Sequence, residues 1–312
     1  MPKKLPTRRL DESESALQSI LERPTCRVCR PVKISGDDLM ISKLKELAPL
    51  WDGLVLSRGP EPKEFEGILL ASVPNTPALA HWAAGELNIR KFCGRPDFHL
   101  PPVLFYGPPG TGKTTAARLL AQAAGTPFHV FNVAASSDAR TLLGTSAGYS
   151  TGSAGLAAKI MARTRRANPV LVVDEIDKAC GDDRGGSWKD GLLPYLESST
   201  AGSIFDEFLM NDIDCRHITW IATANDLDRI PAPLLDRFHL IEFKLRPPID
   251  IKAFDLQVLQ GLAEETGLEL EVAKALLDEI NVGENIGQLS MRRQKRLARF
   301  ALAKILGTRS LQ

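Results

Sequence analysis

The sequence predicts an α/β fold in which a parallel sheet is covered by helices and is followed by a small helical lid domain. Between about residues 63 and 246, short and almost entirely apolar runs alternate with helix-like segments, which is typical of parallel strands buried on both faces. A Gly-rich loop joins the first of these runs directly to a helix. From Pro247 onward only amphipathic helical periodicity remains, and it predicts the helical domain.

Three regions follow from these patterns. Residues 1–62 are polar and helix-prone, and we expect an N-terminal helical, partly flexible region of unknown role. A Pro/Gly cluster at residues 58–62 looks like the joint to the α/β domain at residues 63–246, which the lid domain follows at residues 247–312. The apolar faces of the expected N-terminal helices comprise Ala16, Leu17, Ile20 and Leu21 on one helix and Ile41, Leu44 and Leu47 on the next.

The individual elements are assigned by periodicity and length. The predicted strands are Val103–Tyr106, Phe128–Val133, Val170–Val173, Ile218–Ala222 and Leu240–Phe243. The helices predicted between them cover residues 113–124, 153–166, 189–197 and 231–236. The lid helices are expected at residues 250–261, 268–279 and 286–306, with a buried stripe in the last one made of Leu297, Phe300, Ala301 and Ile305.

Composition and charge narrow the class of protein. The chain has 312 residues, 44% of them hydrophobic and 25% charged, as is ordinary for a soluble globular protein. Its formal net charge of +1 gives no general reason to expect a nucleic acid or a membrane surface as partner. No apolar run is long enough to span a membrane, and the N-terminus has no apolar signal core. We therefore expect a cytoplasmic protein.

The five cysteines are an odd and scattered set, which favours a reducing compartment over a disulfide framework. Cys26 and Cys29 form one Cys-x-x-Cys pair, but a structural zinc site needs two more ligands and no second pair exists. His81, Cys93 or His99 could in principle complete such a site. We assign no metal ligand to this pair.

The loop behind the first strand has the pattern Gly-x-x-x-x-Gly-Lys-Thr and leads into a helix, which is the context of a phosphate-binding loop. Its glycines let backbone N–H groups point at phosphate oxygens, and the helix N-terminus adds a positive dipole end. A Gly/Pro-rich turn with a surface lysine is the simpler alternative. The predicted nucleotide-binding residues are Gly107, Pro108, Pro109, Gly110, Thr111, Gly112, Lys113, Thr114 and Thr115.

Acidic residues and an amide end two further strands. Asp174 and Glu175 follow Val170–Val173, where Asp174 can hold Mg²⁺ together with the Thr114 hydroxyl and Glu175 can polarise the attacking water. An acidic helix cap is the structural alternative. Asn225 ends the next strand and could orient that water, although Asn is also a common turn residue. These residues turn a binding site into a candidate hydrolysis site.

At this point the residues resemble a known family. Gly107–Thr114, Asp174-Glu175 and Ala222–Asn225 resemble the Walker A, Walker B and sensor 1 motifs of AAA+ ATPases. The resemblance covers roughly residues 65–307 and implies a P-loop NTPase sheet, the AAA+ core, with a helical lid.

Two members of the family are especially similar. Trp220–Phe238, and Ser203–Asp206 ahead of it, resemble the ATPase module of Lon proteases. Leu142–Tyr149 looks like the central-pore loop region of Clp unfoldases. Lon carries a peptidase domain after the lid, and because this chain stops at Gln312 we expect an ATPase that is not a protease by itself.

The resemblance implies further residue roles. Arg237 matches the arginine finger that reaches a neighbouring subunit's γ-phosphate, with Arg229 as a nearby competitor. An exposed arginine that forms a salt bridge is the structural alternative for Arg237. Arg292 resembles the sensor 2 arginine of the lid, although a Lon-type alignment puts Gly287 there and Arg293 or Arg296 could substitute.

Tyr149 is the candidate aromatic that grips a polypeptide in a pore, whereas Lon places its aromatic where this chain has Leu142. A tyrosine packed against its own subunit is the alternative. Residues 181–187 are a possible second pore loop.

Together these features predict an ATP- and Mg²⁺-dependent AAA+ motor that converts ATP and water to ADP and phosphate. We expect it to work as a homo-oligomeric, hexameric ring. The expected work is remodelling or unfolding of a protein substrate, in the manner of a chaperone, for a separately encoded partner. A nucleic-acid-associated loader or transposition-type ATPase is the alternative, with only the basic run Arg292–Arg299 to support it. A nucleotide-dependent scaffold is a third possibility. No membrane partner is expected.

Overall fold

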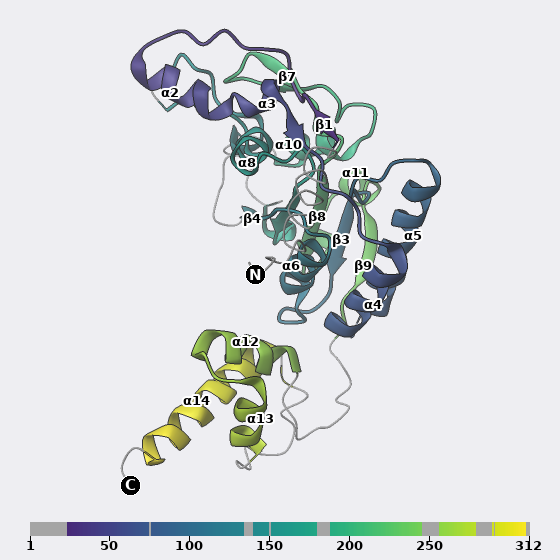
Figure 1. The fold of residues 1–312 in the computed structure, drawn as a ribbon, viewed down its shortest axis with the longest axis vertical. Coiled ribbons are helices and arrows are strands. Elements are labelled where there is room, and N and C mark those ends of the chain that lie inside the picture. The colour runs from purple at the N-terminus through teal and green to yellow at the C-terminus, as the bar shows by residue number, and fades with distance from the viewer. Residues whose placement is uncertain are drawn as a thin grey trace, which may run out of the picture.

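The computed structural model describes residues 24–74, 76–133, 140–149, 151–179, 188–244, 256–278, 289 and 291–309. A parallel five-stranded sheet in the order β4-β5-β8-β3-β9 forms its centre (Figure 1). The strands are β3 (Val103–Tyr106), β4 (Phe128–Asn132), β5 (Val170–Asp174), β8 (Thr219–Ala224) and β9 (His239–Glu242). Each lies within two residues of its predicted bounds, which confirms the predicted α/β fold class.

Side chains that alternate along the strands build a separate core on each face of the sheet. Val103, Phe105 and Ile221 pack with α4 (Pro62–Ser72), α5 (Pro77–Phe92) and α6 (Lys113–Ala123). Leu104, Val173 and Trp220 belong to the core of the other face. The helices on that face are α7 (Arg140–Leu143), α8 (Leu156–Thr164) and α10 (Trp188–Leu196). The short α9 (Ile176–Ala179), η3 (Leu227–Arg229) and α11 (Ala232–Leu235) follow strand ends.

The described part of the N-terminal region shares the core of the second face. It contains β1 (Thr25–Cys26), α2 (Asp38–Leu47), α3 (Pro49–Asp52) and β2 (Leu54–Val55), and β1 pairs antiparallel with β2. Leu50 and Leu54 are fully buried in the cluster that also holds Trp220. The hydrophobic core therefore runs across the boundary expected at residue 62. Leu44 and Leu47 are buried as predicted, whereas the apolar face at residues 16–21 lies outside the described residues.

An antiparallel hairpin that the periodicity did not predict joins β6 (Ile204–Asp206) to β7 (Asn211–Ile213). Its strands have only three residues each, too few for alternation to be visible in the sequence. Asp206 anchors the hairpin, because its carboxylate accepts hydrogen bonds from the backbone N–H groups of Gly155, Phe208 and Leu209.

The C-terminal helices α12 (Leu256–Thr266), α13 (Leu270–Asp278) and α14 (Met291–Arg309) have a small core of their own. In α14 the buried residues of this core are Ala298, Ala301 and Leu302. The predicted stripe was wrong at Phe300, whose residue surface is 71% exposed. The face of α14 that packs against α12 is displaced by about one residue from the predicted face, which included Phe300. Among the described residues no helix is long and apolar enough to cross a membrane.

Candidate functional site

The loop between β3 and α6 needs glycine for its shape. Gly107, Gly110 and Gly112 all have positive φ, at 137°, 81° and 89°, a region that favours glycine. At Gly107 a Cβ atom would also lie 2.1 Å from the Phe243 carbonyl oxygen. The Gly107 N–H donates to the Ala224 carbonyl at 3.2 Å, which ties the loop to β8. The loop is therefore held at the carboxyl end of the sheet, beside the N-terminus of α6.

Lys113 is the first residue of α6, and its side chain is directed back into the loop. The ammonium donates to the carbonyl oxygens of Gly107 (2.7 Å) and Pro108 (3.0 Å) and to Asn225 Oδ1 (2.9 Å). Burial lowers the pKa of Lys113 to about 8, and the nearby carboxylates of Asp177 and Asp174 only partly offset this effect. The lysine and the strand-end asparagine that were predicted separately are thus in contact.

A hydroxyl and a carboxylate meet at the neighbouring strand end. Thr114 Oγ1 donates to Asp174 Oδ1 at 2.8 Å, and Thr223 Oγ1 donates to the same oxygen at 2.6 Å. Hydroxyl and carboxylate oxygens are the hard ligands that Mg²⁺ prefers. The chemistry of Thr114 and Asp174 therefore fits a magnesium ion beside the phosphate loop.

Glu175 has an unusual backbone conformation at the end of β5. Its φ of 59° is left-handed, which costs a non-Gly residue roughly 1–2 kcal/mol. Two contacts hold it there: its N–H donates to Thr223 Oγ1 at 3.0 Å, and its carboxylate pairs with Lys178 at 2.7 Å. Strained residues of this kind cluster at functional sites. Here the turn lets Glu175 line the same cavity as Asp174.

These residues enclose a cavity of about 150 Å³. Typical ligand pockets hold roughly 300–1,000 Å³, so this cavity suits phosphate groups better than a whole nucleotide. Arg292, the second residue of α14, lines it, while the alternatives Arg293 and Arg296 do not; Gly287 lies outside the described residues. The lining residues are Pro109, Gly110, Gly112, Lys113, Thr114, Thr115, Asp174, Glu175, Thr223, Asn225 and Arg292.

Two residues of this site were missed in the sequence. Thr223 bonds both Asp174 and Glu175, and Asp177 accepts a hydrogen bond from the Asn225 N–H at 3.2 Å. Asp177 is buried and its Oδ1 has no partner among the described residues. Thr223 is the second residue of the predicted Ala222–Asn225 motif, and Asp177 follows Asp174 by three positions, so proximity to those motifs was the available signal.

Arg237 lies outside this cavity. Its Nε donates to Glu197 Oε2 at 3.0 Å and its guanidinium also donates to the Pro233 carbonyl at 2.9 Å. Its competitor Arg229 pairs with Asp226 at 3.3 Å and is more exposed, with 68% of its side-chain surface accessible against 36% for Arg237. Neither arginine lines the phosphate cavity of its own chain.

Tyr149 is at the tip of an exposed loop, and 71% of its surface is accessible. An antiparallel bridge between Thr145 and Ser153 closes the base of the loop, and Lys43 Nζ of α2 donates to the Gly152 carbonyl at 2.8 Å. Most of the Tyr149 surface is thus free of contact with the described residues. Leu142, the other candidate position, is fully buried in the core.

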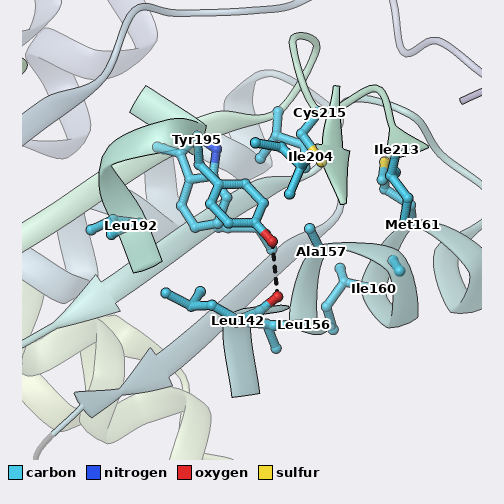
Figure 2. Close-up of a cluster of buried hydrophobic side chains, with 14 of the residues drawn as sticks. Leu142, Leu156, Ala157, Ile160, Met161, Leu192, Tyr195, Ile204, Ile213 and Cys215 are labelled. Atoms are coloured by element: carbon cyan, nitrogen blue, oxygen red, sulfur yellow. Dashed lines mark hydrogen bonds between the residues drawn. The ribbon is translucent and has the colours of Figure 1, made fainter. Parts of the chain in front are cut away.

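Figure 2 shows the surroundings of Leu142, whose carbonyl accepts a hydrogen bond from the Tyr195 hydroxyl at 2.8 Å. A side chain in that position cannot contact a substrate without unfolding of the core. The possible second pore loop at residues 181–187 lies outside the described residues.

Cys26 and Cys29 are free thiols beside β1. Burial raises the pKa of each to about 11, and nearby carboxylates add to the effect. In the described part of the chain, no three His, Cys, Asp or Glu side chains lie close enough together to share a metal ion.

Comparisons with known proteins agree with this geometry. A family model described as "ATPase family associated with various cellular activities (AAA)" matches residues 103–245. The chain is 37% identical to a Lon protease of Syntrophus aciditrophicus (strain SB) over 156 residues, which are 50% of this chain and 19% of that protein.

Mitochondrial Lon protease homologues are similar over a somewhat longer stretch. The homologue of Yarrowia lipolytica is 31% identical over 180 residues, 57% of this chain and 15% of that protein. The homologue of Saccharomyces cerevisiae is 32% identical over 184 residues, 59% of this chain and 16% of that protein. The matched part of the chain thus spans less than a quarter of the length of each of these relatives.

Proposed function

We propose that this chain is an ATPase of the AAA family, with a module similar to that of Lon proteases, and that it works as a ring-forming motor that hydrolyses ATP to remodel protein substrates. The observation that carries the proposal is the convergence of Lys113, Asp174 and Asn225 on one small cavity at the carboxyl end of a parallel sheet. Sheets of this class bind ligands at that end.

The residues divide the reaction between them. Backbone N–H groups of Gly110–Thr114 hold the phosphates, and the Lys113 ammonium exchanges its loop carbonyl partners for phosphate oxygens. Thr114 and Asp174 would hold a magnesium ion, which would neutralise charge on the phosphates. Glu175 accepts a proton from the attacking water, and Asn225 orients that water.

A ring explains why Arg237 lies outside its own cavity. Charge that develops on the transferred phosphoryl group needs a donor such as arginine, and a neighbouring subunit can deliver it. The contact of Arg237 with Glu197 keeps the guanidinium ordered near the surface until a neighbour is present. Arg292 would contact the nucleotide from the lid helices. We propose that six subunits form this ring.

Substrate handling is proposed from the Tyr149 loop. An exposed aromatic side chain at a loop tip can contact an extended polypeptide, and Lys43 and the Thr145–Ser153 bridge fix the base of the loop. The similar proteins are Lon proteases, so proteolysis of the remodelled substrate, by this protein or by a partner, is the step that would follow. We place this function in the cytoplasm, the compartment expected from the sequence.

The nucleic-acid alternative is less well supported. It needs the basic run Arg292–Arg299 as a free cationic face, yet Glu265 of α12 pairs with Lys295 at 2.6 Å and with Arg299 at 3.7 Å. Part of that positive charge is therefore neutralised within the lid helices.

The test of the proposal is Glu175→Gln. The amide keeps the size of the side chain but cannot accept the proton, so turnover should fall by about 10²-fold or more while ATP binding is retained. ATP hydrolysis is measured by phosphate release and binding by calorimetry with a non-hydrolysable analogue. In the same protein, a pull-down with ATP should retain a polypeptide client.

Glu207→Gln, a change of a glutamate that does not line the cavity, is the matched control and should leave both properties unchanged. Undiminished hydrolysis by the Glu175→Gln protein would disprove the role of Glu175. Capture of DNA in place of polypeptide would instead favour the nucleic-acid alternative.

A further inference from the structure

A second cavity lies at the opposite end of the sheet from the phosphate loop. It holds about 460 Å³, within the roughly 300–1,000 Å³ typical of small-molecule pockets. Pro102 and Ile218, which directly precede β3 and β8, line it, whereas the phosphate loop and Asn225 follow the same two strands. Because β3 and β8 are parallel, one cavity lies at the carboxyl ends of these strands and the other at their amino ends. The two cavities share no lining residue.

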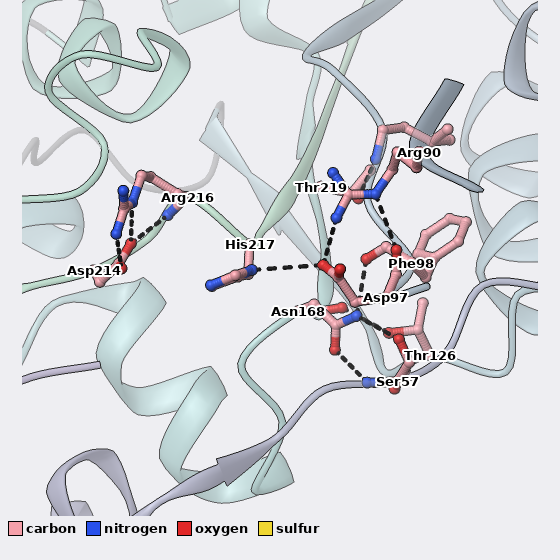
Figure 3. A network of polar contacts seen from close by, with 11 residues as sticks. Ser57, Arg90, Asp97, Phe98, Thr126, Asn168, Asp214, Arg216, His217 and Thr219 are labelled. Carbon is pink, nitrogen blue, oxygen red and sulfur yellow. Dashed lines mark hydrogen bonds and ion pairs between the residues drawn. The ribbon is translucent and has the colours of Figure 1, made fainter. Parts of the chain in front are cut away.

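The arginines around this cavity outnumber the carboxylates that pair with them. Figure 3 shows Arg90 bound to Asp97 and Arg216 bound to Asp214, with Arg216 Nη2 to Asp214 Oδ2 at 2.6 Å. Arg95, an exposed residue, also lines the cavity, and its guanidinium has no acidic partner among the described residues. The cavity thus has one guanidinium more than the carboxylates beside it can neutralise.

The Asp97 carboxylate is committed to the protein. Burial favours its neutral form, but a hydrogen bond to His217 and the charge of Arg90 outweigh burial and lower the pKa of Asp97 to about 2. It therefore remains an anion that holds Arg90 in place, as Figure 3 shows. Arg95 is left as the cation that a ligand can reach.

Part of the cavity wall is aromatic. The rings of Tyr195 and Trp220 pack edge to face with centroids 5.2 Å apart, and both line the cavity. The Trp220 indole N–H is buried and has no hydrogen-bond partner among the described residues. Buried donors are normally paired, so this one calls for an acceptor that the described residues do not supply.

His99 adds a neutral polar group to the wall. Burial and the charge of Arg90 lower the pKa of His99 to about 4, so the imidazole is uncharged at neutral pH. A neutral imidazole offers one donor and one acceptor, and it adds no charge that would compete for an anion.

From the Arg95 guanidinium, which has no acidic partner in the described part of the chain, and from the aromatic wall, we propose that this cavity binds a small organic anion with a flat apolar body. The anionic head, a carboxylate, sulfonate or phosphate, pairs with Arg95, and the flat body packs against Tyr195 and Trp220. The site needs neither ATP nor a neighbouring subunit, so the inference is independent of the proposed motor function.

The experiment uses two fluorescent probes that differ only by one sulfonate group: 8-anilinonaphthalene-1-sulfonate and its uncharged parent, N-phenyl-1-naphthylamine. Arg95→Glu should weaken binding of the sulfonate at least about tenfold, as loss of a charged hydrogen bond predicts, and leave the uncharged probe within about twofold. Arg27→Glu, the same change at an exposed arginine away from the cavity, is the matched control and should leave both affinities unchanged.

A second variant blocks the space and keeps the charge. Ser198 is an exposed lining residue just after α10, so Ser198→Trp should fill the cavity without disturbing the core and abolish saturable binding of both probes. Thermal melting verifies that each variant is folded. The inference is overturned if Arg95→Glu and Ser198→Trp bind the sulfonate as the unchanged protein does, or if Arg95→Glu weakens both probes equally.

Discussion

At the scale of single residues, Thr223 shows how one hydroxyl organises the site. It donates to Asp174 at 2.6 Å and accepts from the Glu175 N–H at 3.0 Å, and it is almost fully buried. The positions of both candidate site residues, Asp174 and Glu175, thus depend on the same oxygen. The left-handed backbone at Glu175 is held in part by this bond, since no glycine is present there to adopt it freely.

Thr223→Val should therefore impair chemistry more than binding. The isosteric side chain leaves the Glu175 N–H unsatisfied, a loss of roughly 1–3 kcal/mol in positioning, so we expect kcat to fall by about tenfold or more with little change in KM. Steady-state ATPase kinetics measure both quantities. Thr223→Ser, which restores the hydroxyl, should recover most of the activity; an unchanged kcat in Thr223→Val would show that the hydroxyl does not position the acids.

At the scale of elements, the loop that carries Tyr149 is built to present one side chain. Its base is closed by the Thr145–Ser153 bridge, and α2 contacts it through Lys43. Gly152 lies where a Cβ atom would be 2.6 Å from the Ser146 carbonyl, so the turn is tight. The N-terminal region thus bears directly on the proposed substrate loop.

Tyr149→Ala should uncouple substrate from hydrolysis. An unstructured protein such as casein should stimulate ATPase activity of the unchanged protein, and this stimulation should be lost in Tyr149→Ala while basal turnover persists. Tyr149→Phe, which keeps the ring, should restore it. Equal stimulation of all three proteins would rule out this loop as the point of contact.

The connection between α5 and β3 also links separate elements. Its residue Asp97 pairs with Arg90 of α5 and with His217, which lies just before β8 (Figure 3). The pKa of Asp97 falls from 3.8 to about 2 on folding. The stabilisation of the fold by the ionised Asp97 carboxylate is therefore fully present above pH 3.8 and is lost as the pH falls towards 2.

Asp97→Asn should lower the free energy of unfolding by about 2 kcal/mol at pH 6, the value of a shift of this size. Urea titrations at several pH values should show the difference from the unchanged protein shrinking below pH 3.8. Asp212→Asn, at an exposed carboxylate, serves as the control and should have almost no effect. A difference that does not vary with pH would mean that the ion pair is not its source.

At the scale of the whole molecule, the proposed ring makes each site depend on a neighbour. A mixing experiment follows from this arrangement. Arg237→Ala has an intact site but no finger, and Lys113→Ala has a finger but no working site, so each should be inactive alone. Mixed, they should regain part of the ATPase activity because Lys113→Ala subunits supply Arg237 to the Arg237→Ala sites. Arg229→Ala is the matched comparison, and recovery there in place of Arg237→Ala would reassign the finger.

The fold class and the centre of the site could be predicted from the sequence because their signals are local. The apolar strands, the loop Gly107–Thr114 and the acids after β5 are each contiguous, and every predicted strand appears within two residues. Phe300 was misassigned for the converse reason: which face of α14 is buried depends on where α12 packs.

The amino-acid sequence was therefore sufficient to predict a parallel sheet with a phosphate loop and acidic residues at the ends of its strands. Which of these groups come into contact depends on the tertiary structure, because β8 lies between β5 and β3 in the sheet. This strand brings Thr223 to Asp174 and Asn225 to Lys113, and each pair is more than forty positions apart in the chain. Long-range pairing likewise buried Leu142, exposed Tyr149 and enclosed the second cavity beside Arg95. None of these contacts has a local signal, since each depends on how separate elements pack.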